Sequence, residues 1–123
     1  FGVTWSKLDE IYQGSFFDIT RTQQGNLVVA GLRGNVFRSL KNGTPWQKTE
    51  TETTSLLSSI VLSDDERIFI VGTSGMVLES RDDGKSFSER PQADGKAIVA
   101  GVWFKGQLVV VSEVGVKQIG MTK

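Results

Sequence analysis

The sequence predicts an all-β protein, a β-propeller built of four-stranded antiparallel blades, and three observations support this prediction. The chain of 123 residues contains an internal repeat of 41 residues. Each repeat resolves into four short runs of strand-forming residues separated by turn signals. No stretch shows the apolar spacing of about 3.6 residues that a helical repeat of this length would require. A four-stranded sheet that recurs every ~40–45 residues is the construction of a propeller blade.

The repeat is visible in the aromatic and glycine positions. Trp5, Trp46 and Phe87 follow one another at an interval of 41 residues. A third, partial copy, QLVVVSEVGVKQI at 107–119, is one residue short of this period. So many coincident intervals do not arise by chance, and the same interval relates Ser39 to Ser80, Gly43 to Gly84, Gly31 to Gly72 and Gly34 to Gly75.

The repeat divides the chain into parts of a single propeller ring. Residues 1–8 are predicted to supply the outer strand of a preceding blade, with the strand itself at Val3–Leu8. Residues 9–50 and 51–90 are each predicted to form a complete blade, and residues 91–123 a last blade of three strands. The expected strands are 15–20, 26–31, 35–40 and 45–50 in the first complete blade, 56–62, 67–72, 76–80 and 86–90 in the second, and 97–104, 107–112 and 116–119 in the last.

The strand count predicts how isolated copies of the chain associate. The last blade lacks an outer strand, and Val3–Leu8 is a strand of the type that it lacks. We therefore expect two isolated copies to exchange this strand in a homodimer that closes a six-bladed ring, above the minimum of about four blades that propellers use. The chain begins at Phe1 without a methionine or a signal sequence, which indicates a processed product or a piece of a longer chain whose further blades would take the second copy's place.

The composition excludes several classes of function. The formal net charge is zero and the basic residues are scattered, so the chain has no electrostatic footprint for nucleic acid. It contains neither cysteine nor histidine, which removes thiolate chemistry and the commonest metal ligand and general base. We expect no metal and no cofactor. The longest apolar run, 98–104, is too short to cross a bilayer, so the chain is not expected to be embedded in a membrane.

The segment SRDDGKSF at 80–87 lies between the third and fourth predicted strands of the second blade. The Asp82 carboxylate can accept backbone N–H groups inside a tight turn, and Gly84 permits a positive φ angle. Ser80 can hold the end of the strand, and Phe87 is expected to point back between the sheets. The alternative is a metal site at Asp82 and its neighbour Asp83, which the adjacent Lys85 and Arg81 argue against.

The corresponding segment of the first blade, SLKNGTPW, is a degenerate copy of this turn. Ser39 and Trp46 occupy the positions of Ser80 and Phe87, but Lys41 stands in place of Asp82 and cannot accept a hydrogen bond. Asn42 and Gly43 offer a substitute, because Asn-Gly is a strong signal for a type I′ hairpin. The predicted structural turn residues are therefore Ser80, Asp82, Gly84 and Phe87, with Ser39, Asn42, Gly43 and Trp46 in the earlier copy.

These segments resemble known families. The pattern Ser-x-Asp-x-Gly-x-Ser/Thr-Trp/Phe resembles the Asp box, or BNR repeat, which sialidases and many other propellers carry on their rim outside the catalytic site. The segments GLRGNVFRS, GTSGMVLESRDDGKSF and LVVVSEVGVKQI resemble the C-terminal part of the photosystem II stability/assembly factor-like family over about Trp5 to Ile119. The chain departs from the family pattern at Lys41 and at Glu113, where a glycine is expected to recur.

The resemblance implies a non-catalytic scaffold that binds a protein outside the cytoplasm, either in the periplasm or as a secreted protein. The implied partner is a membrane protein or a membrane-associated complex, which arginines on the faces of the ring are thought to contact. Arg33 lies in the predicted turn between the second and third strands of the first blade, so we take it as a candidate partner-binding residue. The alternative is that Arg33 is an ordinary solvated surface residue.

The other function considered is a carbohydrate-binding module or a sialidase-like glycoside hydrolase. Such an enzyme needs a tyrosine nucleophile paired with a glutamate and several arginines that clamp a carboxylate. Tyr12 is the only tyrosine, Glu10 precedes it, and no arginine triad accompanies them. We therefore expect no enzyme activity and take Tyr12 as a second candidate partner-binding residue, or as a packing aromatic.

Overall fold

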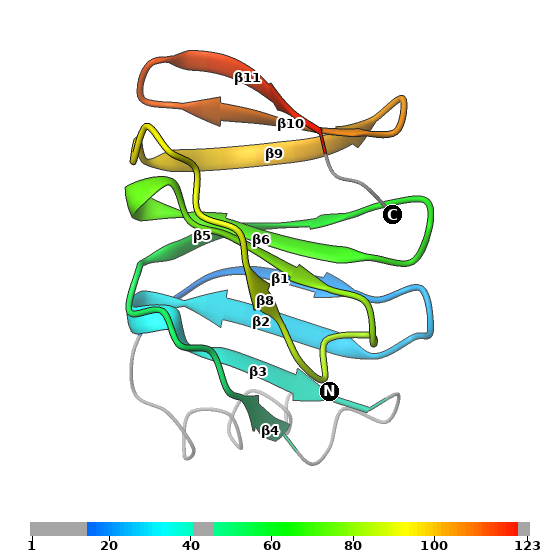
Figure 1. The fold of residues 1–123 in the computed structure, drawn as a ribbon. Coiled ribbons are helices and arrows are strands. Elements are labelled where there is room, and N and C mark those ends of the chain that lie inside the picture. The colour runs from blue at the N-terminus through cyan, green and yellow to red at the C-terminus, as the bar shows by residue number, and fades with distance from the viewer. Residues whose placement is uncertain (1–14, 41–45, 121–123) are drawn as a thin grey trace.

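Residues 15–40 and 46–120 are described by the computed structural model, and their strands form three antiparallel sheets (Figure 1). This confirms the predicted all-β propeller class. The predicted strand Val3–Leu8 and the turn residues Lys41, Asn42 and Gly43 lie outside the described residues. The strands of the first sheet are β1 Phe16–Arg21, β2 Leu27–Gly31, β3 Val36–Ser39 and β4 Trp46–Thr49; those of the second are β5 Leu57–Leu62, β6 Ile68–Gly72, β7 Val77–Ser80 and β8 Ser88–Glu89; those of the third are β9 Ile98–Phe104, β10 Gln107–Ser112 and β11 Gly115–Ile119.

The three sheets are stacked face to face, with β1, β5 and β9 closest to one another (Figure 1). In each sheet the strands follow one another in chain order, so neighbours are joined by hairpins. The outer strands are shorter than the sequence predicts: β4 covers only part of 45–50, and β8 only two residues of 86–90. The sheets therefore touch mainly through their first three strands.

Strand β6 shows why the central runs of the sequence are apolar at every position. Ile68 and Ile70 face the first sheet, while Phe69 and Val71 face the third. All four side chains are at least 98% buried, since their exposed fractions are 0–2%. Two apolar layers result, one on each side of the second sheet, and burial of apolar surface at about 25 cal/mol per Å² is their main source of stability.

The inner strands share one irregularity in register. Phe17, Ser58 and Val99 are each passed over in the pairing of their strand with the next, which makes an equivalent bulge in every sheet. Opposite the first two bulges lie Gly31 and Gly72, where the entering backbone approaches so closely that no side chain fits. A Cβ atom on Gly72 would lie 2.0 Å from the carbonyl oxygen of Leu56.

The third sheet departs from this pattern. Its β9–β10 hairpin is one residue shorter than the β5–β6 hairpin, as the shift in paired residues shows. Ser112, which pairs with Ile98, therefore occupies the position of Gly72, which pairs with Leu57. The sequence interval of 41 residues had placed Glu113 there, and this placement is wrong by one residue.

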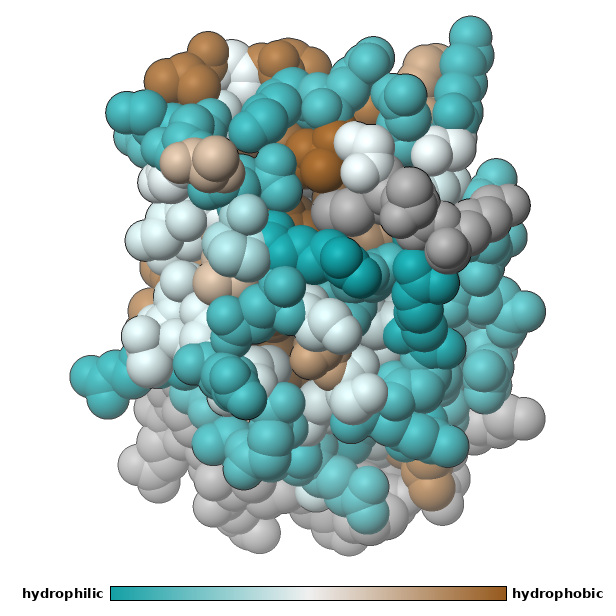
Figure 2. Space-filling model, in the orientation of Figure 1, coloured by the Kyte–Doolittle hydropathy of each residue, from teal (hydrophilic) through white to brown (hydrophobic). Residues whose placement is uncertain are grey.

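The face of the third sheet that points away from the second sheet is apolar and exposed. Val102, Val111 and Val116 have exposed fractions of 56%, 47% and 74%. They correspond in register to Val61, Val71 and Val77 of the second sheet, which are buried against the third. Figure 2 shows apolar side chains gathered at the top of the molecule, over β9–β11. Within the described residues no helix is long and apolar enough to cross a membrane.

Gly72→Ala is expected to lower the free energy of unfolding by about 1–3 kcal/mol, because the added methyl group overlaps the Leu56 carbonyl and forces the backbone apart. Gly120→Ala is the matched control, since a Cβ atom at Gly120 meets nothing within 4 Å. Urea unfolding of both variants measures the difference. Equal losses in the two variants would contradict the close approach of the two strands.

Candidate functional site

The turn between β7 and β8 is closed by Asp82. The Ser86 N–H donates to Asp82 Oδ1 at 2.9 Å, and the Ser86 hydroxyl donates to Oδ2 at 2.5 Å. The Ser80 hydroxyl donates to Oδ1 at 2.8 Å and accepts the Gly84 N–H at 2.9 Å. Burial raises the pKa of Asp82, but the hydrogen bonds from Ser86 and Ser80 outweigh it and hold this pKa below its usual range. Asp82 is thus an ionised acceptor inside its own turn.

The backbone of this turn is left-handed at two successive residues. Asp83 has a φ angle of 64° and Gly84 one of 88°. This is the conformation that Asp-Gly pairs favour in tight hairpins. Gly84 also sits against the first sheet, because an added Cβ atom would lie 3.2 Å from a methyl group of Val28. The turn therefore lies in the space between two sheets.

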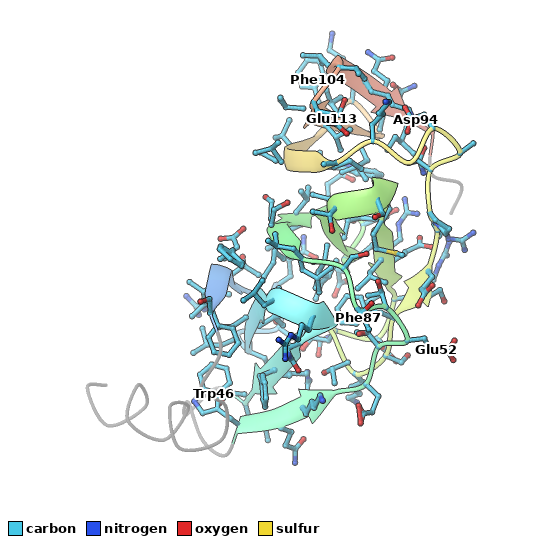
Figure 3. The ribbon with its side chains drawn as sticks, turned by 90° about the vertical axis from the view of Figure 1, so that its left-hand side faces the viewer. Trp46, Glu52, Phe87, Asp94, Phe104 and Glu113 are labelled. Atoms are coloured by element: carbon cyan, nitrogen blue, oxygen red, sulfur yellow. The ribbon has the colours of Figure 1, made fainter. Side chains whose placement is uncertain are left out.

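The aromatic residues of the two turn copies lie at corresponding places in their sheets (Figure 3). Phe87 is half-buried and packs against the apolar layer between the first and second sheets. Trp46 is buried on the other face of the first sheet, with Val29 and Phe37. Its indole Nε1 has no hydrogen-bond partner among the described residues. Ser39 is buried as well, and its hydroxyl has only a long contact of 3.5 Å with the Leu40 carbonyl oxygen.

Asp83 is the turn residue whose role the sequence did not reveal. It is buried, with an exposed fraction of 6%, and contacts the first sheet instead of its own turn. Arg38 Nη2 donates to Asp83 Oδ2 at 3.1 Å, and Arg38 Nε donates to the Asp83 carbonyl oxygen at 2.8 Å. The Asn26 amide also donates to Oδ2, and the Thr49 hydroxyl donates to the Gly84 carbonyl oxygen at 2.9 Å. The turn thereby joins two sheets.

A second charged cluster lies on the second sheet around Glu79. Its carboxylate is 2% exposed and forms ion pairs with Arg67 at 2.8 Å, Arg90 at 2.8 Å and Arg81 at 3.2 Å. Burial raises the pKa of Glu79, but the arginine hydrogen bonds lower it further than burial raises it, so the net shift is downward. Asp65 pairs with Arg67 at 2.9 Å, and the Arg67 hydrogen bond lowers the pKa of Asp65 to about 2.

Arg67 also connects the second sheet to the third. Its guanidinium carbon lies 5.1 Å from the ring centroid of Trp103 and 5.2 Å from that of Phe69. These two rings are stacked with centroids 5.4 Å apart, and the Trp103 Nε1 donates to Asp64 Oδ1 at 2.9 Å. The charged groups of this cluster are therefore engaged in cation–π and ion-pair contacts within the fold.

The chemistry available to these clusters is limited. A general acid must hold a proton near neutral pH, and the lowered pKa values keep Asp65, Glu79 and Asp82 ionised there. Within residues 15–40 and 46–120, no group of three acidic side chains is placed to hold a metal ion. Both clusters hold neighbouring strands and sheets together.

Arg33 lies at the opposite end of β3 from the turn described above. It is the central residue of the 3-10 turn Leu32–Gly34, longer than the predicted two-residue turn, and has a φ angle of 57°. Its side chain is exposed, and no hydrogen bond or ion pair ties it to the rest of the described residues. Ser74, with a φ angle of 60°, holds the same place in the second sheet. The other candidate partner-binding residue, Tyr12, lies outside the described residues.

Comparison with known proteins gives one curated relative and several solved structures. No family model matches the chain. Over 66 residues the chain is 36% identical to the photosystem II assembly lipoprotein Ycf48 of a Picosynechococcus species. The matched segment is 51% of this chain and 19% of that protein. The chain therefore spans only about a fifth of the length of this relative.

The solved structures extend the match in fold. YCF48 bound to a D1 peptide superposes with a TM-score of 0.72 at 15% identity, over 86% of this chain and 38% of the other. YCF48 from Cyanidioschyzon merolae gives 0.70 at 20% identity, over 85% and 36%. Virginiamycin B lyase from Staphylococcus aureus gives 0.66 at 13% identity, over 89% and 42%. Similarity to Ycf48 in both sequence and fold confirms the resemblance to the photosystem II assembly-factor-like propellers.

Asp82→Ala is expected to lower the free energy of unfolding by about 1–2 kcal/mol, because the amide of Ser86 and the two hydroxyl groups lose their acceptor. Lys41→Ala, at the equivalent position of the first repeat, is expected to be nearly neutral. Thermal melts of both variants provide the measurement. A loss of the same size at Lys41 would contradict the role given to the carboxylate.

Glu79→Gln is expected to lower the free energy of unfolding by about 3 kcal/mol at neutral pH, because the arginines lose a buried carboxylate. The pKa of Glu79 is lowered in the folded protein, so its contribution is complete above the unfolded value of about 4.3 and is lost as the pH falls through the folded value. The difference between wild type and variant should therefore shrink in acid. A difference that stays constant down to about pH 2, far below the unfolded value, would contradict this account.

Proposed function

We propose that this chain is part of a non-catalytic protein-binding propeller that acts as an assembly-factor-like scaffold. The observation that supports this most directly is the 66-residue similarity to an assembly lipoprotein, together with a fold match to YCF48 in complex with a D1 peptide. By extension, the ligand of this chain is an extended segment of a protein. The segment belongs to a membrane protein or to a membrane-associated complex.

Arg33 is the residue that we assign to this contact. A left-handed turn at the end of two strands holds its side chain out from the sheet. A guanidinium group binds carboxylates through two parallel hydrogen bonds, and such charge-assisted bonds are stronger than neutral ones. The other arginines with assigned partners, at 38, 67, 81 and 90, are engaged within the fold. The proposed partner segment therefore carries a carboxylate, and no nucleic acid is involved.

Binding outside the cytoplasm, in the periplasm or after secretion, is part of the proposal. Its support is the description of the curated relative as a lipoprotein. The strand-exchanged homodimer stays a prediction, since its exchanged strand, Val3–Leu8, lies outside the described residues.

An enzymatic function is not favoured by the chemistry of the described residues. The carboxylates that are buried between the strands have arginine or backbone partners and lowered pKa values. The lyase structure is 13% identical, a similarity that speaks for the fold alone. We propose that the chain uses neither a metal nor a cofactor and that it is neither a glycosidase nor a carbohydrate-binding module.

Arg33→Ala is expected to weaken binding of a carboxylate-bearing peptide by about tenfold or more, because one charge-assisted hydrogen bond contributes roughly 1.5–3 kcal/mol. The probe is a set of fluorescein-labelled acidic peptides that copy the exposed termini of membrane proteins from the source organism, and fluorescence anisotropy gives the affinity. Arg21→Ala is the matched control, because Arg21 is an exposed arginine at the opposite end of the first sheet.

Two results would contradict the proposal at different levels. Absence of binding by every peptide in the set would count against the protein-binding function. Binding that responds equally to Arg33→Ala and Arg21→Ala would retain that function but remove Arg33 from the contact.

A further inference from the structure

The two adjacent acids of the β7–β8 turn act on different sheets. The hydrogen bonds of Asp82 go to Ser80 and Ser86, within its own turn. Those of Asp83 come from Asn26 and Arg38, on the sheet that precedes it in the chain. The Arg38–Asp83 pair is nearly buried, with side-chain exposures of 9% and 6%. Loss of one partner of such a pair leaves an uncompensated charge between the sheets.

The other two sheets carry different residues at the positions that hold Asp83. In the pairing registers, Arg38 lies opposite Val28, Glu79 opposite Phe69 and Gln118 opposite Val109, so these three residues are equivalent. The residues that precede the first common pairs are equivalent in the same way: Asn26, Arg67 and Gln107. The three sheets therefore offer Asn and Arg, Arg and Glu, and Gln and Gln to the turn of a following sheet.

These three pairs of side chains differ in the turn that they can accept. On the first sheet, Arg38 directs two hydrogen bonds to an acidic turn. On the second sheet the equivalent position is a carboxylate, Glu79, and Arg67 is already bound to Asp65 and Glu79. An acidic turn placed there would bring two carboxylates together in a poorly solvated space, which is unfavourable. The third sheet offers two neutral amides, which cannot balance a buried charge.

We propose that the residue at the Asp83 position and the residue at the Arg38 position form a pairing code that fixes which blade docks on which. The acidic turn of the second blade fits the sheet β1–β4 and is rejected by a sheet that carries glutamate at the Arg38 position. The apolar layers are alike at both interfaces and do not distinguish one blade from another. The buried charges supply that distinction, so they determine blade order as well as stability.

The code is tested by copying the other sheets' residues into the first sheet. Arg38→Gln reproduces Gln118, and Arg38→Glu reproduces Glu79. With Asp83 present, Arg38→Gln is expected to raise the unfolding equilibrium constant about tenfold and Arg38→Glu about a hundredfold, because glutamate adds repulsion to the lost ion pair. With Asp83→Asn in the same chain, the two Arg38 variants should become equal within about twofold. Arg38→Glu combined with Asp83→Arg should recover most of the loss, since the pair is restored with its charges exchanged.

Urea unfolding of the 123-residue chain gives these constants, and Lys117→Glu is the matched control. Lys117 and Asp94 form an ion pair at 3.4 Å with side-chain exposures of 35% and 40%, so its reversal should change the constant by only about twofold. If Arg38→Glu does not fold, Asp83→Asn alone still reports: amide hydrogen exchange should quicken at Gly84, while β6 stays protected. Equal losses for Arg38→Gln and Arg38→Glu with Asp83 present would overturn the proposal. So would a failure of the charge exchange to recover stability, or unchanged exchange at Gly84 in Asp83→Asn.

Discussion

The packing of one sheet's face on the next is the interaction on which this structure depends. Strand β6 sends Ile68 and Ile70 to one side and Phe69 and Val71 to the other, and a single sheet would leave one of these pairs in water. Each sheet therefore requires a neighbour. Apolar faces hold sheets together without fixing how they are ordered, because the hydrophobic effect has no direction. Order and alignment come from polar groups near the strand ends, above all from the contacts of Asp83 with Arg38 and Asn26.

Sequence patterns predicted the features that depend on neighbours along the chain. The 41-residue interval and the non-alternating apolar runs led to the confirmed propeller class. They did not reveal the partners of Asp83, because Arg38 lies 45 residues earlier and Asn26 lies 57 residues earlier. Only the stacking of the sheets brings these residues together. A signal was nevertheless present: Arg38 stands within VFRS, a strand whose side chains are all buried, and a buried arginine requires an acidic partner.

The site predictions divide in the same way. The closure of the turn by Asp82 involves Ser80 and Ser86, which are close in sequence, and residue chemistry was enough to anticipate it. The cluster around Glu79 draws its arginines from β6, the β7–β8 turn and the residue after β8, so no local motif marks it. The misplacement of the third glycine position at Glu113 arose because one shortened hairpin shifts the register while the sequence interval remains constant. Arg33, which these contacts leave out of the fold's charged clusters, is the arginine that the proposed function requires.

Backbone amide hydrogen exchange in the unmodified protein tests most directly whether the turn residues are structural. If Asp82 and Asp83 hold sheets together, the amides of Gly84 and Ser86 should exchange as slowly as those of β6, since both open only when the sheets separate. Their rates should be the same in calcium and in a chelator. Fast exchange at Gly84 and Ser86 beside a protected β6, or protection that appears only when calcium is added, would contradict this account and would indicate a ligand site in the turn.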